Sequence, residues 1–268
     1  MKNSAPRRDI GCALAFDFLE PSVLALQVAP PTVLSEELTV VGAPAPIVLT
    51  GVNGGRTHVI EAGAGLVSVN YTASTAPLDR PLAPVGQFDE QVLVARRQSR
   101  YCPSDAMAEF AARELIDFLD AEDLADQVAS WVFERTAYDL FVSGPTDTAV
   151  DTLLAGRGVC RDFAHLTIAM CRALFIPARL ASVYAPGVDP MDFHAVVEVW
   201  RDERWDVIDA TRMAPRSSLV RIATGRDAAD TAFAATITGD VELLSSEVFA
   251  VVDGNLPADD HITPMTLA

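Results

Sequence analysis

One cysteine stands in a sequence context that could activate its thiol. Cys160 follows the loop Gly156–Val159 and begins the run Cys160–Phe175, which is apolar on nearly every side and predicts a helix buried in the core. The unpaired N–H groups and the positive dipole end of a helix favour the thiolate, the form that attacks a carbonyl carbon. The same N–H groups can donate to the oxyanion that forms during acyl transfer. Taken alone, Cys160 could equally be a small buried core residue.

A nucleophilic cysteine needs a base within hydrogen-bond reach and a third group that orients the base. Four histidines compete for the role of base: His58, His165, His194 and His261. His165 lies five residues after Cys160 on the same predicted helix, so it points about 140° away and is expected to be packed in the core. His58 and His261 have no neighbouring acid pattern that would orient them. His194 is therefore the candidate base.

The strand that begins at His194 also predicts the orienting acid. If residues 201–204 form the turn of a hairpin, His194 faces Thr211, and Asp209 becomes its diagonal neighbour on the same face. Such diagonal positions are about 7–8 Å apart, a gap that an imidazole and a carboxylate can bridge. Asp206 falls on the opposite face, although a turn shifted by one residue would reverse the choice. Without the register, Asp209 would be taken for a turn or capping residue.

The elements that must position these residues follow a change of pattern along the chain. Short apolar runs separated by turn residues up to about residue 100 are typical of strands. Helical spacing follows over Met107–Leu119 and from Asp123 to about Tyr138, before the buried helix. We predict an N-terminal antiparallel β module over residues 1–100, a catalytic domain over 101–254 and a polar tail over 255–268. The second domain carries the expected strands Arg179–Ala185, His194–Arg201, Arg204–Ala210 and Val241–Val252.

Composition excludes several classes of protein. Half of the residues are apolar, as in a globular protein, and the formal net charge of −17 argues against binding to nucleic acid or to an anionic membrane. The acidic surface serves solubility or, alternatively, favours cationic substrates. The four cysteines lack metal-like spacing with the histidines, so we expect no metal, no cofactor and reduced thiols. Asp9 and Asp17 interrupt the N-terminal apolar run, and no stretch is long enough to span a membrane, which predicts a cytoplasmic protein.

Three segments carry a resemblance to a known family. The run GRGVCRDFAHLTIAMCRALFIPAR, followed by DFHAVVEVW and WDVIDATR, resembles the signature blocks of the bacterial transglutaminase-like family. The resemblance implies an α+β fold with a papain-like core, a buried helix packed on an antiparallel sheet, preceded by a β-rich N-terminal domain. It also implies a triad in which Cys160 is the nucleophile, His194 the general base and later acid, and Asp209 the orienting group. Ala210 departs from the pattern, since the family commonly has proline there.

The resemblance implies acyl transfer through a thioester, with a peptide or protein as substrate. Water as acceptor would make a peptidase or amidase, and an amine would make a transglutaminase. We favour hydrolysis because the sequence shows no calcium-binding loop and no second substrate site. A binding module without turnover is the third alternative. The sequence leaves the oligomeric state open. It also leaves open the oxyanion donor beyond the Cys160 amide, because Tyr71, Tyr101 and Trp131 could each contribute to the site or could be core aromatics.

Overall fold

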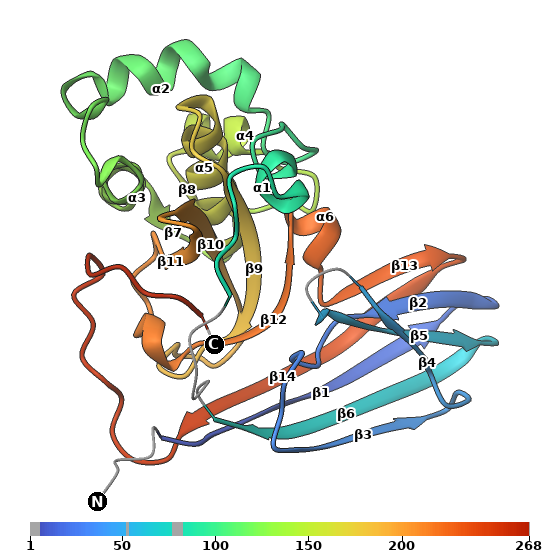
Figure 1. Cartoon of the computed structure of the whole chain (residues 1–268). Helices are drawn as coiled ribbons and strands as arrows, with labels where there is room; N and C mark the ends of the chain where they lie inside the picture. Colours follow the sequence, from blue (N-terminus) through green and yellow to red (C-terminus); the bar gives the residue numbers. More distant parts are fainter. Residues whose placement is uncertain (1–5, 52–53, 77–82, 268) are drawn as a thin grey trace, which may run out of the picture.

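The computed structural model describes residues 6–51, 54–76 and 83–267. Two antiparallel four-stranded sheets pack face to face in a β sandwich, and a third sheet carries helices on one side (Figure 1). The first sandwich sheet has the order β14-β1-β6-β3, with β1 Arg8–Phe18, β3 Ser35–Val41, β6 Gly65–Thr75 and β14 Val241–Val252. The second has the order β13-β2-β5-β4, with β2 Ser22–Leu26, β4 Ile47–Thr50, β5 Arg56–Ala62 and β13 Ala234–Thr238.

Alternation along the strands explains the sandwich. In β1 every second side chain from Ile10 to Phe18 is buried between the two sheets, and β6 does the same from Val67 to Ala73. These side chains form one core with Leu24, Leu26 and Ile60 of the second sheet. The predicted N-terminal strands are therefore present.

The C-terminal strands return to this sandwich. β14 pairs along its length with β1, and β13 pairs with β2. The predicted boundaries placed Val241–Val252 in the second domain, whereas in the structure these residues pair with a strand of the predicted N-terminal β module. The division into two domains is still a prediction.

The third sheet supports the buried helix α5 (Cys160–Ala173). It is antiparallel, with the order β11-β10-β9-β12, and its strands are β9 Ala178–Tyr184, β10 Phe193–Arg201, β11 Arg204–Ile208 and β12 Val220–Gly225. Around α5 and the sheet lie α1 Glu90–Val94, α2 Ala108–Glu114, α3 Leu124–Arg135, α4 Ala149–Ala155 and α6 Ala228–Thr231 (Figure 1). Eleven of the fourteen α5 residues are buried. The predicted α+β fold, with a buried helix packed on an antiparallel sheet and a β-rich N-terminal region, is confirmed.

The hairpin between β10 and β11 has the predicted register. Trp200 pairs with Trp205, and Arg201 pairs with Arg204. Asp202 and Glu203 form the turn with φ angles of 49° and 58°, the conformation that a tight two-residue hairpin turn requires. The backbone therefore delivers the residues after Ile208 to the end of the sheet where β10 begins.

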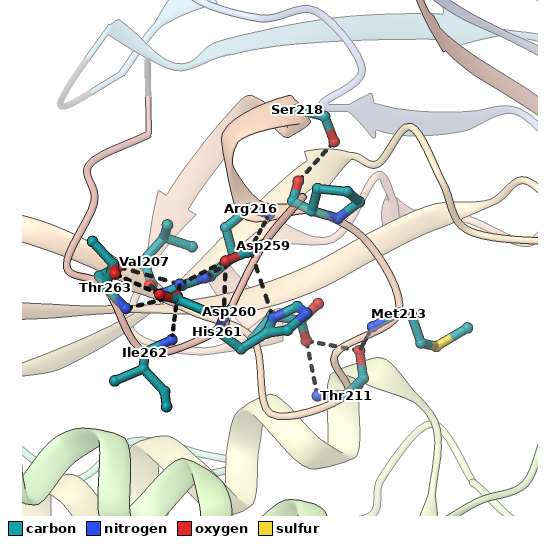
Figure 2. Close-up of polar contacts among 12 residues, drawn as sticks. Val207, Thr211, Met213, Arg216, Ser218, Asp259, Asp260, His261, Ile262 and Thr263 are labelled. Atoms are coloured by element: carbon teal, nitrogen blue, oxygen red, sulfur yellow. Dashed lines mark hydrogen bonds and ion pairs between the residues drawn. The ribbon is translucent and has the colours of Figure 1, made fainter. Parts of the chain in front are cut away.

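The C-terminal segment has no helix or strand over its described residues 253–267, yet it is anchored. Arg216, whose side chain is 1% exposed, donates to both carboxylate oxygens of Asp259 at 2.8 and 3.0 Å (Figure 2). Farther along, Val207 donates its N–H to the Met265 carbonyl at 2.8 Å, and Leu267 is buried against the sheet. The segment thus covers the outer edge of β11, which would otherwise expose unpaired backbone groups.

Candidate active site

The loop before α5 is shaped so that Cys160 begins the helix. α4 is capped at its C-terminus by Gly156, whose φ of 64° turns the chain into the short strand β8 (Arg157–Gly158). Asp162 then folds back and accepts the N–H of Val159 at 2.9 Å, as expected of a carboxylate in the first turn of a helix. A Cβ on Gly158 would lie 2.6 Å from the Asp162 Cβ, so only glycine leaves room for this cap.

Cys160 differs from the other cysteines in its exposure. All four lie within the described residues and are free; Cys12, Cys102 and Cys171 are buried, whereas Cys160 is half-buried. Burial raises the pKa of Cys12 to about 11 and that of Cys102 and Cys171 to about 12, so these thiols stay protonated and sheltered. Cys160 is therefore the thiol available to a reagent or substrate.

His194 and Asp209 form the pair that the register predicts. Nε2 of His194 lies 2.9 Å from Oδ2 of Asp209, and both side chains are 1% exposed. The His194 ring is also within hydrogen-bond reach of the Cys160 thiol. Since Asp209 occupies Nε2, Nδ1 is the ring nitrogen left for the thiol. Figure 2 shows the neighbouring turn at Thr211 and Met213.

In this pair, each side chain stabilises the charged form of the other. Burial opposes the imidazolium, but the charge and hydrogen bond of Asp209, together with the Cys160 thiol, raise the pKa of His194 to about 10. Burial alone would likewise raise the pKa of Asp209, but His194 and the hydrogen bonds from Thr211 lower it below its usual range. The geometry therefore favours a charged imidazolium beside the thiol.

Thr211 completes the orientation of the acid, a role that the sequence reasoning did not assign. Its backbone N–H and its hydroxyl donate to Oδ1 of Asp209 at 2.9 and 2.7 Å. Oδ1 is thus committed to Thr211, and Oδ2 faces His194. Arg212, with a φ of 56°, turns the chain directly afterwards. The signal in the sequence was the Asp-x-Thr spacing itself, since a hydroxyl two residues after a carboxylate closes a local hydrogen-bonded turn.

The remaining histidines lie away from this pair, as expected. His165 stacks on Tyr101 with ring centroids 5.0 Å apart and accepts the N–H of Ala228, and burial lowers the pKa of His165 to about 4. His58 is buried in the β sandwich, and His261 lies in the C-terminal segment, 3.7 Å from Asp259. Among the described histidines, His194 alone bonds to Asp209.

Other candidates from the sequence serve structural contacts. Asp206 accepts from Arg201 and Arg204 at 2.7 and 2.9 Å, on the face away from His194. The Tyr71 hydroxyl donates to Glu36, and the Trp131 indole donates to Glu114. A residue not singled out before, Tyr138 on β7 (Ala137–Tyr138), places its hydroxyl beside Cys160 instead.

Features that would indicate other chemistry lie elsewhere or are not found in the described part of the chain. No three His, Cys, Asp or Glu side chains of residues 6–51, 54–76 and 83–267 gather in a way that could hold a metal ion. A cavity of about 530 Å³ is lined by Gln91, Arg179 and Arg226, between the β module and the far end of α5 from Cys160. Within the same described ranges, no helix has the length and apolar character needed to cross a membrane.

Comparisons with known proteins find similarity in sequence and in fold. Residues 112–210 match the model of the transglutaminase-like superfamily. The fold is similar to the crystal structure of a candidate cysteine protease from Cytophaga hutchinsonii, with a TM-score of 0.87 and 29% sequence identity, covering 97% of this chain and 96% of that one.

Two curated mycobacterial proteins of uncharacterised function are also similar. The Mycobacterium leprae protein is 24% identical over 185 residues, which cover 66% of this chain and 62% of that protein. A Mycobacterium tuberculosis (strain H37Rv) protein is 30% identical over 146 residues, covering 47% and 45%. The matched part of the chain thus spans 62% and 45% of the length of these relatives.

Proposed function

We propose that this chain, a transglutaminase-like protein, is an enzyme that hydrolyses peptide or amide bonds through Cys160, His194 and Asp209. One observation carries the proposal: a buried imidazole reaches the thiol of Cys160 while its Nε2 lies 2.9 Å from the Asp209 carboxylate. A nucleophile, a base and an orienting group in hydrogen-bond sequence are the requirement for covalent acyl transfer. The similarity to a candidate cysteine protease supports the same class of reaction.

Each residue has one task in the reaction. His194 holds the proton of the Cys160 thiol, and the thiolate attacks the carbonyl carbon, so that a C–S bond forms and the carbonyl π electrons move to oxygen. When the intermediate collapses, the C–N bond breaks and the departing amine takes the proton from His194. The thioester is then cleaved by water, whose proton His194 accepts. Asp209 keeps its charge throughout and fixes the tautomer of His194.

The acceptor distinguishes the proposed hydrolase from a transglutaminase, because the triad would be the same in both. A carboxamide donor such as a glutamine peptide, incubated with and without a labelled primary amine, tests both outcomes by mass spectrometry. Hydrolysis releases the acid, whereas transfer attaches the label. We expect the acid as the main product. If the labelled product dominates, the proposed function changes from hydrolysis to amine transfer.

The covalent step can be tested without knowing the natural substrate. We expect p-nitrophenyl acetate to acetylate Cys160 with a burst of nitrophenolate, and to leave a Cys160→Ala variant unmodified. Cys171→Ala is the matched control, because it removes a buried thiol from the same helix. Peptide binding without acylation of Cys160 would instead support a non-catalytic binding module.

We also propose that the protein acts in the cytoplasm on peptides or proteins. The four cysteines are free, which suits a reducing compartment. Cell fractionation of a producing bacterium checks the location. Recovery of the protein outside the cytoplasmic fraction would contradict it.

A further inference from the structure

The loop that carries Asp209 is closed at its base. This Asp209 loop, residues 207–216, begins within β11 and ends at the start of a short 3₁₀ helix (Arg216–Ser218). Nη1 of Arg216 donates to the Val207 carbonyl at 3.2 Å, so one side chain joins the two ends of the loop (Figure 2). The carboxylate that faces His194 therefore projects from a ring closed by a hydrogen bond.

Hydrogen bonds inside the Asp209 loop connect its backbone to the carboxylate. Thr211 donates to Oδ1 of Asp209 through its N–H and its hydroxyl. The Thr211 hydroxyl accepts the N–H of Met213 at 3.3 Å, and the Asp209 carbonyl accepts the N–H of Arg212 at the same distance. Because these bonds link the loop residues in series, a displacement at the base of the loop is passed on to the carboxylate.

The C-terminal segment, residues 253–267, holds the side chain of Arg216. This side chain is 1% exposed and donates to both carboxylate oxygens of Asp259, and the Arg216 N–H donates to Oδ2 of Asp259 at 2.7 Å. Nη2 also donates to the Thr263 carbonyl at 3.2 Å. Because a guanidinium group is planar and rigid, a carboxylate bound at two of its nitrogens fixes the direction of the third, Nη1, toward Val207.

The same segment also holds the other end of the Asp209 loop. Val207 donates its N–H to the Met265 carbonyl at 2.8 Å. Leu267, which is 2% exposed, belongs to the same apolar cluster as Val207 and Ala214. Both ends of the loop are thus bonded to a segment from the far end of the chain.

We propose that Arg216 and Asp259 are positioning residues for the catalytic site, and that the C-terminal segment is part of the scaffold that holds Asp209 against His194. The imidazole and the carboxylate are 2.9 Å apart. A hydrogen bond is lost once its donor and acceptor separate beyond about 3.5 Å, so a shift of roughly 0.5–1 Å in the loop weakens the pair. This role rests on the proposed function, because it acts through the triad.

Two variants test the role. Asp259→Asn keeps the shape of the side chain and removes the charge that binds the guanidinium. Arg216→Lys keeps a positive charge for Asp259, but an ammonium group lacks the rigid fork that reaches Asp259 and Val207 together. The readout is the pH profile of iodoacetamide labelling at Cys160, resolved by mass spectrometry at a temperature at which each variant is folded. A purely structural role would lower the unfolding temperature and leave this profile unchanged.

Two controls separate positioning from charge and from stability. Asp260→Asn removes the same charge from the next residue, whose carboxylate lies 3.4 Å from Arg216 and is 55% exposed. Ile60→Ala removes buried atoms from the core of the β sandwich, a different cluster from the one around the Asp209 loop. Ile60→Ala therefore lowers stability at a distance from the triad.

We expect labelling at pH 6 to be about 3–10-fold slower in Asp259→Asn and Arg216→Lys, with a gap that closes above pH 9, where the thiol ionises without the imidazolium. Both controls should keep the wild-type profile. Wild-type profiles in the two test variants would overturn the assignment and leave the triad standing. An equal slowing in either control would also overturn it, because charge or stability would then explain the effect. If wild-type Cys160 itself titrates as an ordinary thiol near pH 8.5, the proposed function fails, and the positioning role fails with it.

Discussion

Replacing Asp209 by asparagine isolates the orientation of the base from the packing around it. Thr211 donates both its N–H and its hydroxyl to Oδ1, so an asparagine at this position must place its carbonyl oxygen there as the acceptor. The NH₂ group of the asparagine then faces Nε2 of His194. In the wild type, this nitrogen lies 2.9 Å from the carboxylate oxygen Oδ2 of Asp209. Nε2 becomes an acceptor, and the ring proton moves to Nδ1, the nitrogen that must receive the thiol proton. The variant keeps its hydrogen bonds but holds the wrong tautomer.

The size of the effect follows from thiol ionisation. At pH 6 about 0.3% of an ordinary thiol with a pKa of about 8.5 is ionised, so losing the imidazolium lowers the thiolate population by up to about 300-fold. A thiolate stabilised by a cation is less nucleophilic than a free one, which offsets nearly half of that difference on a logarithmic scale. We therefore expect Asp209→Asn to be alkylated about 10–50-fold more slowly at pH 6, and the gap to close above pH 9.

The assay is the rate of iodoacetamide labelling of Cys160, with thermal unfolding as a check that the fold persists. Asp192→Asn is the matched control, because this carboxylate lies two residues before His194 and accepts the N–H of Phe193. Wild-type labelling in Asp209→Asn at pH 6 would refute the tautomer argument. An equal slowing in Asp192→Asn would show that general charge near the histidine, and not its orientation, sets the rate.

Three further predictions concern the scaffold. Gly158→Ala should lower the free energy of unfolding by about 1–2 kcal/mol in urea titration, because the new Cβ displaces the Asp162 cap. An unchanged midpoint of urea unfolding would show that the loop accommodates the methyl group without cost. Asp259→Ala removes the nearer carboxylate of the buried Arg216 and leaves only Asp260, at 3.4 Å, so it should cost about 3–5 kcal/mol, whereas a loss below about 1 kcal/mol would mean that solvent or Asp260 replaces the pair. The pKa of His194 is raised in the folded state, so its stabilising contribution is complete below about pH 6.5 and is lost as the pH rises toward 10. The Tm should therefore fall over that range more in the wild type than in His194→Ala, and parallel curves would contradict the pairing.

The hairpin that builds the His–Asp pair could be predicted because its determinants are local. The Trp200–Trp205 pair and the turn at residues 202–203 fix the register within a dozen residues, and a one-residue slip would move every side chain to the other face. Asp209 follows from that register. The contact with His194 could therefore be inferred before any long-range contact was known.

Other parts of the fold depend on contacts between distant segments. The pairing of β14 with β1 joins residues more than 200 positions apart, and alternation within one strand carries no information about its partner. The sequence also predicted a helix as far as Tyr138, whereas α3 ends at Arg135 and an extended segment follows. Tyr138 was overlooked for that reason: its position near Cys160 depends on pairing with β8, which the helical spacing before it conceals.

The anchoring of the C-terminal segment was also outside the reach of local patterns. Its composition is polar and contains proline, and its residues up to 267 form no helix or strand, as the sequence indicated. Its order comes from a buried arginine 43 residues earlier and from Leu267, which packs under the sheet. Only tertiary structure brings these groups together.

The central claim is that Cys160 and His194 form an activated thiolate–imidazolium pair. The most direct test is the pH dependence of iodoacetamide labelling at Cys160, resolved by mass spectrometry, in the wild type and in His194→Ala. We predict rapid labelling of the wild type that persists down to pH 6 and is lost in His194→Ala. A wild-type rate that rises only near pH 8.5, as for an ordinary thiol, and is unaffected by His194→Ala would contradict the account.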